Sequence, residues 1–379
     1  MNKLLDCCCS SLLMVFLATL YTLPPLTALA QLEQSSQRLS ITDVHNRLIP
    51  QVLLPCIHAA EVQHELGLSP EQIDKLETLL FELDQRWWPA RNLDAQQQRA
   101  TIAQLESELL EHMVKEFPLA VVQRLQQIEL QAQGPRMMLR RDVASLLGLT
   151  PAQQQKFLGL AETTERNIAE MEKRNQQGRS QDYSNQLAAA KQAETASGYA
   201  LLNEEQKQAL NVALGTLLDF SKMQRTYAMA PELVASTEWI GDPIGSILDL
   251  RGKVVVVHFY AFQCINCRNN FDRYDEWVEK FKDSDVVFLG IQTPETKAEA
   301  DADQVRNAAE RDRLRFPVLI DLEHKNWKAW GNTMWPTVYV IDKRGYIRMW
   351  WLGELNWQGA TGDKTVAEAI EKLLNESKD

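Results

Sequence analysis

The strongest constraint on the fold is a buried-strand pattern that ends at a pair of cysteines. Residues 254–260 read VVVVHFY, and such a dense β-branched and aromatic run is typical of a strand covered on both faces of a sheet. Cys264 and Cys267 follow as a CxxC motif, and residues 268–282 then carry aromatic and aliphatic side chains at helical spacing. The sequence therefore predicts a buried strand that turns into a helix, with two cysteines at the turn.

The position of the CxxC motif indicates its chemistry. Backbone N–H groups left unpaired at the start of a helix favour a thiolate at the first cysteine, Cys264. Cys267 lies one turn further and can attack a mixed disulfide at Cys264, so the pair can alternate between dithiol and disulfide. A zinc site would need two more ligands, and the region after residue 237 offers only His258 and His324. We therefore expect a redox-active pair without a metal, in preference to a zinc half-site or an inert structural disulfide.

The rest of the C-terminal region alternates strand and helix patterns. A second buried strand pattern begins with Trp335, Pro336 and Thr337. A proline is tolerated at the start of a strand because no backbone N–H is needed there for hydrogen bonds to the neighbouring strand. The expected elements, in chain order, are a strand at 286–292, a charged helix at 298–313, strands at 317–321, 338–342 and 346–352, and a helix at 363–375. Together with the strand and helix around the CxxC motif, this is the element order of a thioredoxin fold.

The combination of motifs resembles the TlpA-like extracytoplasmic thioredoxins over about residues 238–379. The residues that carry the resemblance are Leu250, Gly252, Lys253, the four valines, Phe259, Cys264, Cys267, Trp335, Pro336, Thr337, Ile341, Asp342 and Gly345. The quartet Cys-Ile-Asn-Cys is similar to that of the DipZ-type relatives in this group. The resemblance implies a C-terminal thioredoxin fold, with a central mixed sheet flanked by helices, in which residues 286–323 form the TlpA-like insertion.

The same resemblance implies roles for individual residues. Cys264 would be the attacking nucleophile and Cys267 the resolving thiol, with Pro336 as a cis-proline that faces them. In the family the backbone before this proline pairs with the substrate strand, which places Trp335 on the docking surface; a packed core tryptophan is the alternative. No dissociable cofactor is implied, because the electrons travel on the two sulfurs of the redox-active disulfide. The flanking residues expected to contact substrate or to tune the pair are Ile265, Asn266 and Thr337.

Two positions depart from the thioredoxin pattern. His258 stands where cytosolic thioredoxins commonly carry a buried Asp, and Gln263 stands where a Trp usually precedes the motif. An imidazole at position 258 can take a proton from the resolving thiol or, when charged, favour the thiolate, so we expect His258 to tune thiol acidity. A neutral core histidine bonded to a backbone carbonyl is the alternative, because burial disfavours the charged form.

Residues 31–230 read as a separate α-helical domain. They are rich in Gln, Leu, Glu and Ala, which are good helix formers, whereas eight of the ten Trp lie after residue 237. We expect a linker at residues 231–237, after a helix that ends near Met229 because Pro231 stops it. Three segments carry an N-cap residue with a Gln three positions later, the pattern of a capping box: Ser69 with Gln72, Thr150 with Gln153, and Asn203 with Gln206.

These three helix starts also resemble the LTxxQ motif of the Spy-like periplasmic helical proteins, some of which are chaperones or stress-sensor partners. The resemblance covers seven residues at a time, and the third copy departs from it at Asn203. Capping alone explains the same residues. A shared helical architecture and a plain capped bundle therefore both remain open.

Residues 1–30 are typical of an export signal. An uncharged apolar run at residues 7–23 precedes Ala28, Leu29 and Ala30, the small-x-small site at which a signal peptidase cuts. The run is also long enough for an uncleaved membrane anchor, which is the alternative to a cleaved signal peptide. In both cases we expect the bulk of the chain outside the cytoplasm, with three cysteines beyond the signal.

Cys56 is the cysteine that no motif explains. His58 and His64 lie near it in the sequence and suggest a metal or haem site, since Cys and His are common metal ligands. These three candidates stand alone, and Pro55 breaks helical register just before them. We therefore expect a partly buried thiol, or one that pairs with another chain.

Charge and motif together restrict the function. Lys and Arg number 40 against 51 Asp and Glu, a net charge of −11 that argues against a nucleic-acid binder. We predict a periplasmic or otherwise extracytoplasmic thiol-disulfide oxidoreductase that acts on exported cysteine-containing proteins. Its direction as reductant, oxidant or isomerase depends on its reduction potential, and a reducing value would imply a membrane thiol transporter as electron donor.

Two other functions are compatible with the same motifs. The first is a client-binding, chaperone-type helical protein that uses the thioredoxin fold as a scaffold. The second is a peroxiredoxin, which normally needs a Thr in a Pro-rich loop before its reactive cysteine. Phe262 and Gln263 do not supply that Thr, so we place the peroxiredoxin last.

Overall fold

The computed structural model describes residues 47–176, 182–235 and 238–376, all of which belong to one compact unit, Arg38–Asp379. The predicted signal peptide or anchor at residues 1–30 lies outside the described residues, as do residues 236–237 of the predicted linker. Among the described helices, none is long and apolar enough to cross a membrane.

The N-terminal part of the described chain is helical, which confirms the predicted fold class. Its α-helices are α3 (Leu53–His58), α4 (Ala60–Glu65), α5 (Pro70–Ala90), α6 (Ala95–Glu116), α7 (Leu119–Gln133), α8 (Arg141–Leu146), α9 (Pro151–Gln176), α10 (Tyr183–Ala200) and α11 (Glu204–Leu214). Helices α3 to α7 enclose one leucine-rich core, and a second core lies among η1 (Gly134–Leu139), α8, α9 and α11.

All three predicted capping boxes are present. In each, the side chain of the N-cap residue accepts from the backbone N–H of the Gln, and the Gln side chain accepts from the N-cap backbone N–H. The second and third boxes also contact each other, since Gln153 Nε2 donates to Gln206 Oε1 at 2.8 Å. The boxes therefore join the starts of α9 and α11, while the Spy-like architecture stays a prediction.

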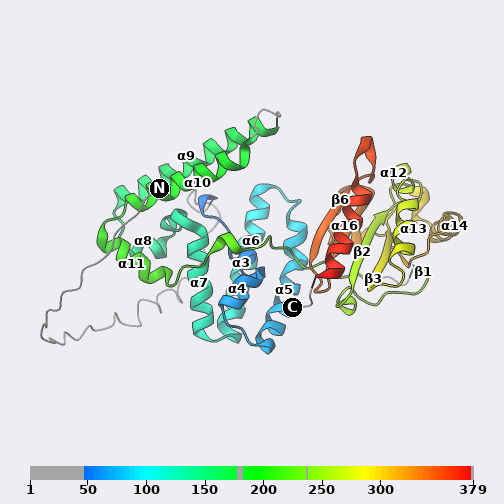
Figure 1. Ribbon diagram of the computed structural model, residues 1–379, viewed down its shortest axis with the longest axis horizontal. Coiled ribbons are helices and arrows are strands. Elements are labelled where there is room, and N and C mark those ends of the chain that lie inside the picture. The colour runs from blue at the N-terminus through cyan, green and yellow to red at the C-terminus, as the bar shows by residue number, and fades with distance from the viewer. Residues whose placement is uncertain (1–46, 177–181, 236–237, 377–379) are drawn as a thin grey trace, which may run out of the picture. The chain divides into compact units, whose positions relative to one another are not determined.

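The C-terminal part is built on a six-stranded mixed sheet with the order β1-β4-β3-β2-β5-β6. Figure 1 shows strands β2, β3 and β6 of this part with helices α13 and α16. Strand β2 pairs in parallel with β3, and β3 in parallel with β4, whereas the other neighbours are antiparallel. The strands are β1 (Trp239–Ile240), β2 (Val254–Tyr260), β3 (Val286–Gln292), β4 (Val318–Ile320), β5 (Thr337–Ile341) and β6 (Ile347–Leu352).

Successive residues of β2 point to two different cores, because side chains alternate across a strand. Val254, Val256 and Tyr260 lie in a core with Cys267 and with residues of α13, α14 and α16. Val255, Val257 and Phe259 lie in the other core, which includes Trp88 of α5. The helices of this part are α12 (Ile265–Arg268), α13 (Phe271–Lys280), α14 (Ala302–Arg311), α15 (Lys325–Ala329) and α16 (Gly362–Asn375).

The prediction of a helix that ends near Met229 is wrong. Helix α11 ends at Leu214, where Gly215 adopts φ +62, a backbone conformation that favours glycine and terminates the helix. Met229 instead forms a β-bridge with Tyr346, and the Ala230 N–H donates to the Gly345 carbonyl at 2.8 Å. The proline at position 231 therefore follows an extended segment that pairs with the β5–β6 hairpin.

The helix predicted over residues 268–282 is also interrupted. Asn270 lies between α12 and α13, with its side chain buried. Its Nδ2 donates to the Tyr274 hydroxyl at 3.2 Å, and its Oδ1 accepts from the Leu355 N–H at 2.9 Å. The local bond to Tyr274 and the long-range bond from Leu355 together stabilise the break between the two helices.

Candidate active site

Cys264 and Cys267 lie at the end of β2, where the chain turns into α12. Cys264 is the N-cap of this helix and is partly exposed, whereas Cys267 is completely buried in the core under the sheet. Both are free thiols in the structure. The backbone turns tightly here, because the Cys267 N–H donates to the Cys264 carbonyl at 3.2 Å.

The two thiols differ in acidity. A hydrogen bond from the Cys267 thiol, together with one from the Cys267 backbone N–H, lowers the pKa of Cys264, although partial burial and the Glu295 carboxylate oppose this. Burial raises the pKa of Cys267, and its hydrogen bond to Cys264 raises it further. Cys264 is therefore the sulfur that ionises first, and Cys267 is the sulfur that keeps its proton.

His258 lies in β2 with its imidazole completely buried. Its ring packs against Tyr260, Tyr274 and Phe316, at centroid distances of 5.5, 4.3 and 4.5 Å. Nε2 has no hydrogen-bond partner among the described residues, and burial lowers the pKa of His258 to about 3. The imidazole is thus neutral at neutral pH, so a charged imidazole does not account for the Cys264 thiolate. Tuning of the thiols by a neutral imidazole stays a prediction.

Trp335 and Pro336 form the loop before β5, and the peptide bond between them is cis. The Trp335 indole is half-buried, stacks on Trp327 at a centroid distance of 3.9 Å, and donates to the Thr293 carbonyl at 3.1 Å. Trp335 and Cys264 pack against the same core, which contains Cys267. The side chain is therefore held in place by specific contacts but still partly open to a partner.

Thr337, Ile265 and Asn266 occupy different environments. Thr337 is buried, and its hydroxyl donates to the Met334 carbonyl at 2.9 Å, so it shapes the loop from inside. Ile265 is 64% exposed directly after Cys264, and Asn266 is half-buried. Leu352, which pairs with Thr337 across β5 and β6, is exposed as well. Apolar side chains therefore flank the reactive cysteine and the cis-proline loop.

Sequence reasoning missed a buried glutamate that orders this site. Glu299 is fully buried, and its carboxylate accepts three backbone N–H groups, those of Gln263 at 2.7 Å, Glu295 at 2.9 Å and Thr296 at 2.8 Å. It thereby ties the residue before Cys264 to the loop after β3. The Thr296-x-x-Glu299 spacing is itself a capping box, and this signal is present in the sequence.

Cys56 has an environment opposite to that of Cys264. It is buried in the leucine-rich core of the helical part, and burial, followed by the charges of Glu129 and Glu106, raises the pKa of its thiol to about 12. Its neighbour in the sequence, His58, bonds through Nε2 to Asp84 at 2.9 Å and through Nδ1 to the Leu54 carbonyl at 2.7 Å. The structure thus places His58 in a buried ion pair and Cys56 in an apolar core.

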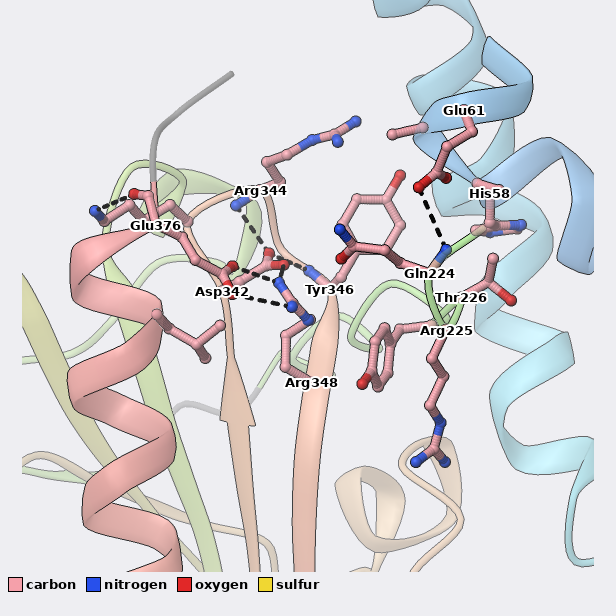
Figure 2. A pocket seen from close by; sticks show the side chains of 15 residues that line it. His58, Glu61, Gln224, Arg225, Thr226, Asp342, Arg344, Tyr346, Arg348 and Glu376 are labelled. Carbon is pink, nitrogen blue, oxygen red and sulfur yellow. Dashed lines mark hydrogen bonds and ion pairs between the residues drawn. The ribbon is translucent and has the colours of Figure 1, made fainter. Parts of the chain in front are cut away.

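A cavity of about 250 Å³, which neither Cys264 nor Cys267 lines, is formed by His58, Glu61, residues 224–227 and residues around the β5–β6 turn (Figure 2). Figure 2 shows the Arg348 guanidinium directed toward Asp342, to which it is bonded at 3.0 Å. Arg348 also pairs with Glu376 at 2.7 Å, and the Gln224 N–H donates to Glu61 at 3.3 Å. Asp342, Arg348 and Glu376 thus satisfy one another's charges, and the described residues that line this cavity include no cysteine.

Comparisons with known proteins agree with this geometry. Residues 229–349 match the AhpC/TSA family. Protein DipZ of Mycobacterium bovis is 32% identical over 174 residues, which cover 45% of this chain and 24% of DipZ. Thiol-disulfide oxidoreductase YkuV of Bacillus subtilis is 22% identical over 147 residues, which cover 39% of this chain and 95% of YkuV.

A solved structure is also similar to part of this chain. The thiol-disulfide isomerase from Corynebacterium glutamicum is 23% identical, covers 39% of this chain and 98% of its own, and has a TM-score of 0.34. The chain spans about a quarter of the length of the DipZ protein that it matches. Residues 229–349 are thus similar to the AhpC/TSA family, and the chain is similar to a protein named as a thiol-disulfide oxidoreductase.

Proposed function

We propose that this chain is a thiol-disulfide oxidoreductase in which Cys264 and Cys267 carry the electrons. The observation that supports the proposal most strongly is the opposite shift of the two pKa values, downward at Cys264 and upward at Cys267. Thiol-disulfide exchange needs a thiolate to attack and a second thiol that stays protonated until the mixed disulfide has formed. The partly exposed Cys264 and the buried Cys267 meet these two needs.

The proposed reaction reduces one disulfide by two electrons. The Cys264 thiolate attacks one sulfur of the substrate disulfide, the substrate S–S bond breaks, and the departing sulfur leaves as a thiolate that takes a proton. Cys267 then loses its proton and attacks the Cys264 sulfur, which releases the second substrate thiol and leaves a Cys264–Cys267 disulfide. The reverse sequence oxidises a dithiol, and no dissociable cofactor takes part in either direction.

The proposed substrates are exported proteins that contain cysteines. The apolar run and the Ala-Leu-Ala site at residues 28–30 support an extracytoplasmic location, by way of a cleaved signal or an uncleaved anchor. Disulfides persist mainly in such compartments, so a protein that works on them belongs there. A membrane thiol transporter is the donor that we propose if the pair works as a reductant.

The test is to trap the mixed disulfide in the full chain. Cys267→Ser removes the resolving thiol. We therefore expect this variant to form disulfide-linked adducts with a model substrate that contains disulfides, such as native insulin, and these adducts are visible on non-reducing gels. Cys264→Ser should form none, and Cys56→Ser, which changes the buried thiol of the helical part, should behave like the wild type. The proposal fails if Cys267→Ser traps no partner and the wild-type protein does not exchange with a model disulfide.

The same variants separate the two other functions. A client-binding protein would suppress the aggregation of an unfolded client even when both Cys264 and Cys267 are serine. A peroxidase would consume peroxide faster than it reduces a disulfide. We do not expect peroxidase activity, because the residues before Cys264 lack the Thr of a peroxidatic loop. We also expect activity to depend on the two cysteines and not on client binding alone.

A further inference from the structure

The end of helix α5 rests on the chain that leads into the cis-proline loop. Trp88 Nε1 donates to the Trp330 carbonyl at 3.0 Å, and Arg91 Nη2 donates to the carbonyls of Trp330 at 3.1 Å and Gly331 at 3.0 Å. Asn92 Nδ2 also donates to the Gly331 carbonyl. Three side chains of the helical part therefore bind two successive carbonyls of the thioredoxin-like part. We call residues 330–331 the clamped turn.

Arg91 is the centre of this contact. Its guanidinium stacks 3.8 Å from the Trp88 ring centroid and also donates to the Trp88 carbonyl at 2.7 Å and to the Tyr339 hydroxyl at 3.3 Å. Among the described residues, no carboxylate forms an ion pair with it, so backbone carbonyls take the place of a counter-ion. A half-buried guanidinium in this setting depends on several donors being satisfied at once, which requires one fixed geometry.

The turn and the helix end fit closely. Gly331 adopts φ +59, and a Cβ added there would lie 3.0 Å from the Pro89 Cα and 3.0 Å from the Asn92 Nδ2. Such contacts are shorter than most Cβ contacts, so a side chain here would be strained and would force its neighbours to shift by a few tenths of an ångström. The turn therefore approaches the helix end through bare backbone.

The clamped turn is connected directly to Trp335. It caps α15, which carries Trp327, and the Trp327 ring stacks on the Trp335 ring at 3.9 Å. On its other side, the Asn332 N–H donates to the Trp327 carbonyl at 3.0 Å, and the Tyr339 hydroxyl donates to Asn332 Oδ1 at 2.6 Å. Fixing the turn thus fixes both the ring beneath Trp335 and the chain that leads to it.

We propose that Arg91, with Trp88 and Asn92, is a positioning residue that holds Trp335 in place for the docking of protein substrates. The proposal rests on the proposed function, because it takes Trp335, which packs against the same core as Cys264, as part of the surface on which protein substrates dock. It gives the helical part a role in substrate recognition that a thioredoxin-like domain alone does not have. Arg91 contacts neither cysteine, and none of its bonds reaches residues 263–268.

This arrangement predicts an effect on docking and not on thiol chemistry. A protein substrate must contact the surface around Trp335, whereas a small disulfide such as hydroxyethyl disulfide needs only access to the Cys264 sulfur. Loss of the clamp should therefore raise KM for a disulfide-containing protein. The rate with the small disulfide, and the pH profile of Cys264 alkylation, should stay as in the wild type.

The experiment compares Arg91→Ala with Arg86→Ala in the full chain. Arg86 lies on the same helix and pairs with Glu108 on α6, so it contacts only the helical part. We expect Arg91→Ala to raise KM for native, disulfide-linked insulin about tenfold, which corresponds to about 1.4 kcal/mol of lost docking free energy. Arg86→Ala should leave KM unchanged, and Arg91→Lys, which keeps the charge but not the fork of donors, should fall between the two.

Hydrogen exchange provides a second readout that does not depend on activity. Peptides covering residues 325–335 should exchange faster in Arg91→Ala, and those covering residues 261–275 should not. Unchanged exchange at residues 325–335, or a parallel loss of activity toward insulin and the small disulfide, would overturn the clamp. If Arg91→Ala does not fold, Asn92→Ala and Arg91→Lys carry the same comparison.

The two proposals can fail separately. A wild-type protein that exchanges with neither insulin nor the small disulfide contradicts the proposed function, and with it the docking role of Arg91. A wild-type protein that exchanges with both, while Arg91→Ala keeps the wild-type KM, contradicts only the clamp.

Discussion

The helical part and the thioredoxin-like part each bury a histidine and contain a cysteine, and the two parts set their protonation in opposite ways. In the helical part, carboxylates surround both groups. Glu129 and Glu106 add to burial in raising the pKa of Cys56 to about 12, and Asp84 raises the pKa of His58 in spite of its burial. Negative charge holds the proton on the thiol and on the imidazole alike.

In the thioredoxin-like part the same two residue types lose their protons more easily. Hydrogen bonds from Cys267 lower the pKa of Cys264, and burial lowers that of His258 to about 3. The comparison teaches that burial alone does not decide the charge of a group. Donors beside the sulfur make a thiolate, carboxylates beside it prevent one, and an isolated imidazole stays neutral.

The largest expected effect concerns the cysteines. Cys264→Ser should reduce exchange with a model disulfide to the uncatalysed background, because the only thiol with a lowered pKa is then absent from the described chain. Cys56→Ser should keep the wild-type rate. An insulin-reduction assay on both variants checks this, and a substantial loss of activity in Cys56→Ser would break the comparison.

Removing the carboxylate beside His58 should have the largest effect on stability. Asp84 is completely buried and accepts from His58 Nε2 at 2.9 Å and from the Met229 N–H at 2.7 Å. Asp84→Asn leaves a buried imidazolium without its counter-ion, so we expect a loss of about 3–5 kcal/mol in the free energy of unfolding.

Urea unfolding at pH 6 measures this loss. Asp74→Asn on the exposed side of the same helix is the control and should change the free energy of unfolding by less than about 0.5 kcal/mol. If both variants lose the same free energy of unfolding, the ion pair between His58 and Asp84 does not stabilise the helical part more than an exposed residue does.

The two histidines should change the free energy of unfolding in opposite directions as the pH changes. The pKa of His58 is raised in the folded chain, so its contribution is complete below the unfolded value near 6.5 and is lost as the pH rises through the folded value. The pKa of His258 is lowered to about 3, so its contribution is complete above about 6.5 and is lost as the pH falls toward 3.

His258→Phe tests the predicted loss of stability at low pH that is due to His258. The variant should lose less stability than the wild type on acidification, by about 2 kcal/mol between pH 6.5 and 5 at about 1.4 kcal/mol per pH unit. His112→Gln, at an exposed position of α6, should follow the wild type. Identical acid unfolding of His258→Phe and the wild type would contradict a neutral buried His258.

The smallest predicted effect belongs to a helix cap. Asn203 Oδ1 accepts from the Gln206 N–H at 2.8 Å, so Asn203→Ala should lower the free energy of unfolding by about 1 kcal/mol. Thermal unfolding measures the change. Exchange activity should be unaltered, because this cap lies in the helical part, and a loss of activity would show that the boxes of α9 and α11 act beyond capping.

Features that depend on local sequence were predictable, and those that depend on distant contacts were not. The limits of β2 and β3 and the three capping boxes follow from neighbouring residues, and the structure has them as expected. The bond from Trp88 to Trp330 joins residues 242 positions apart, and no local pattern indicates it. The extended segment at Met229 likewise depends on its partner Tyr346.

The candidate site shows the same division. The CxxC motif marks Cys264 and Cys267 because their spacing and their place after a strand are local signals. The neutral state of His258 depends on three rings from β2, α13 and the chain before β4, so the sequence alone left two alternatives open. Glu299 was missed because its three backbone partners include Gln263, 36 positions away.

A redox titration of the full chain shows whether Cys264 and Cys267 form a reversible disulfide. The protein is equilibrated in dithiothreitol buffers of graded potential, the thiols are alkylated, and the peptide that contains Cys264 and Cys267 is quantified by mass spectrometry. The account predicts that this peptide passes from dithiol to disulfide in a single two-electron transition while Cys56 stays a thiol throughout. A Cys264–Cys267 pair that remains dithiol at every accessible potential would contradict it.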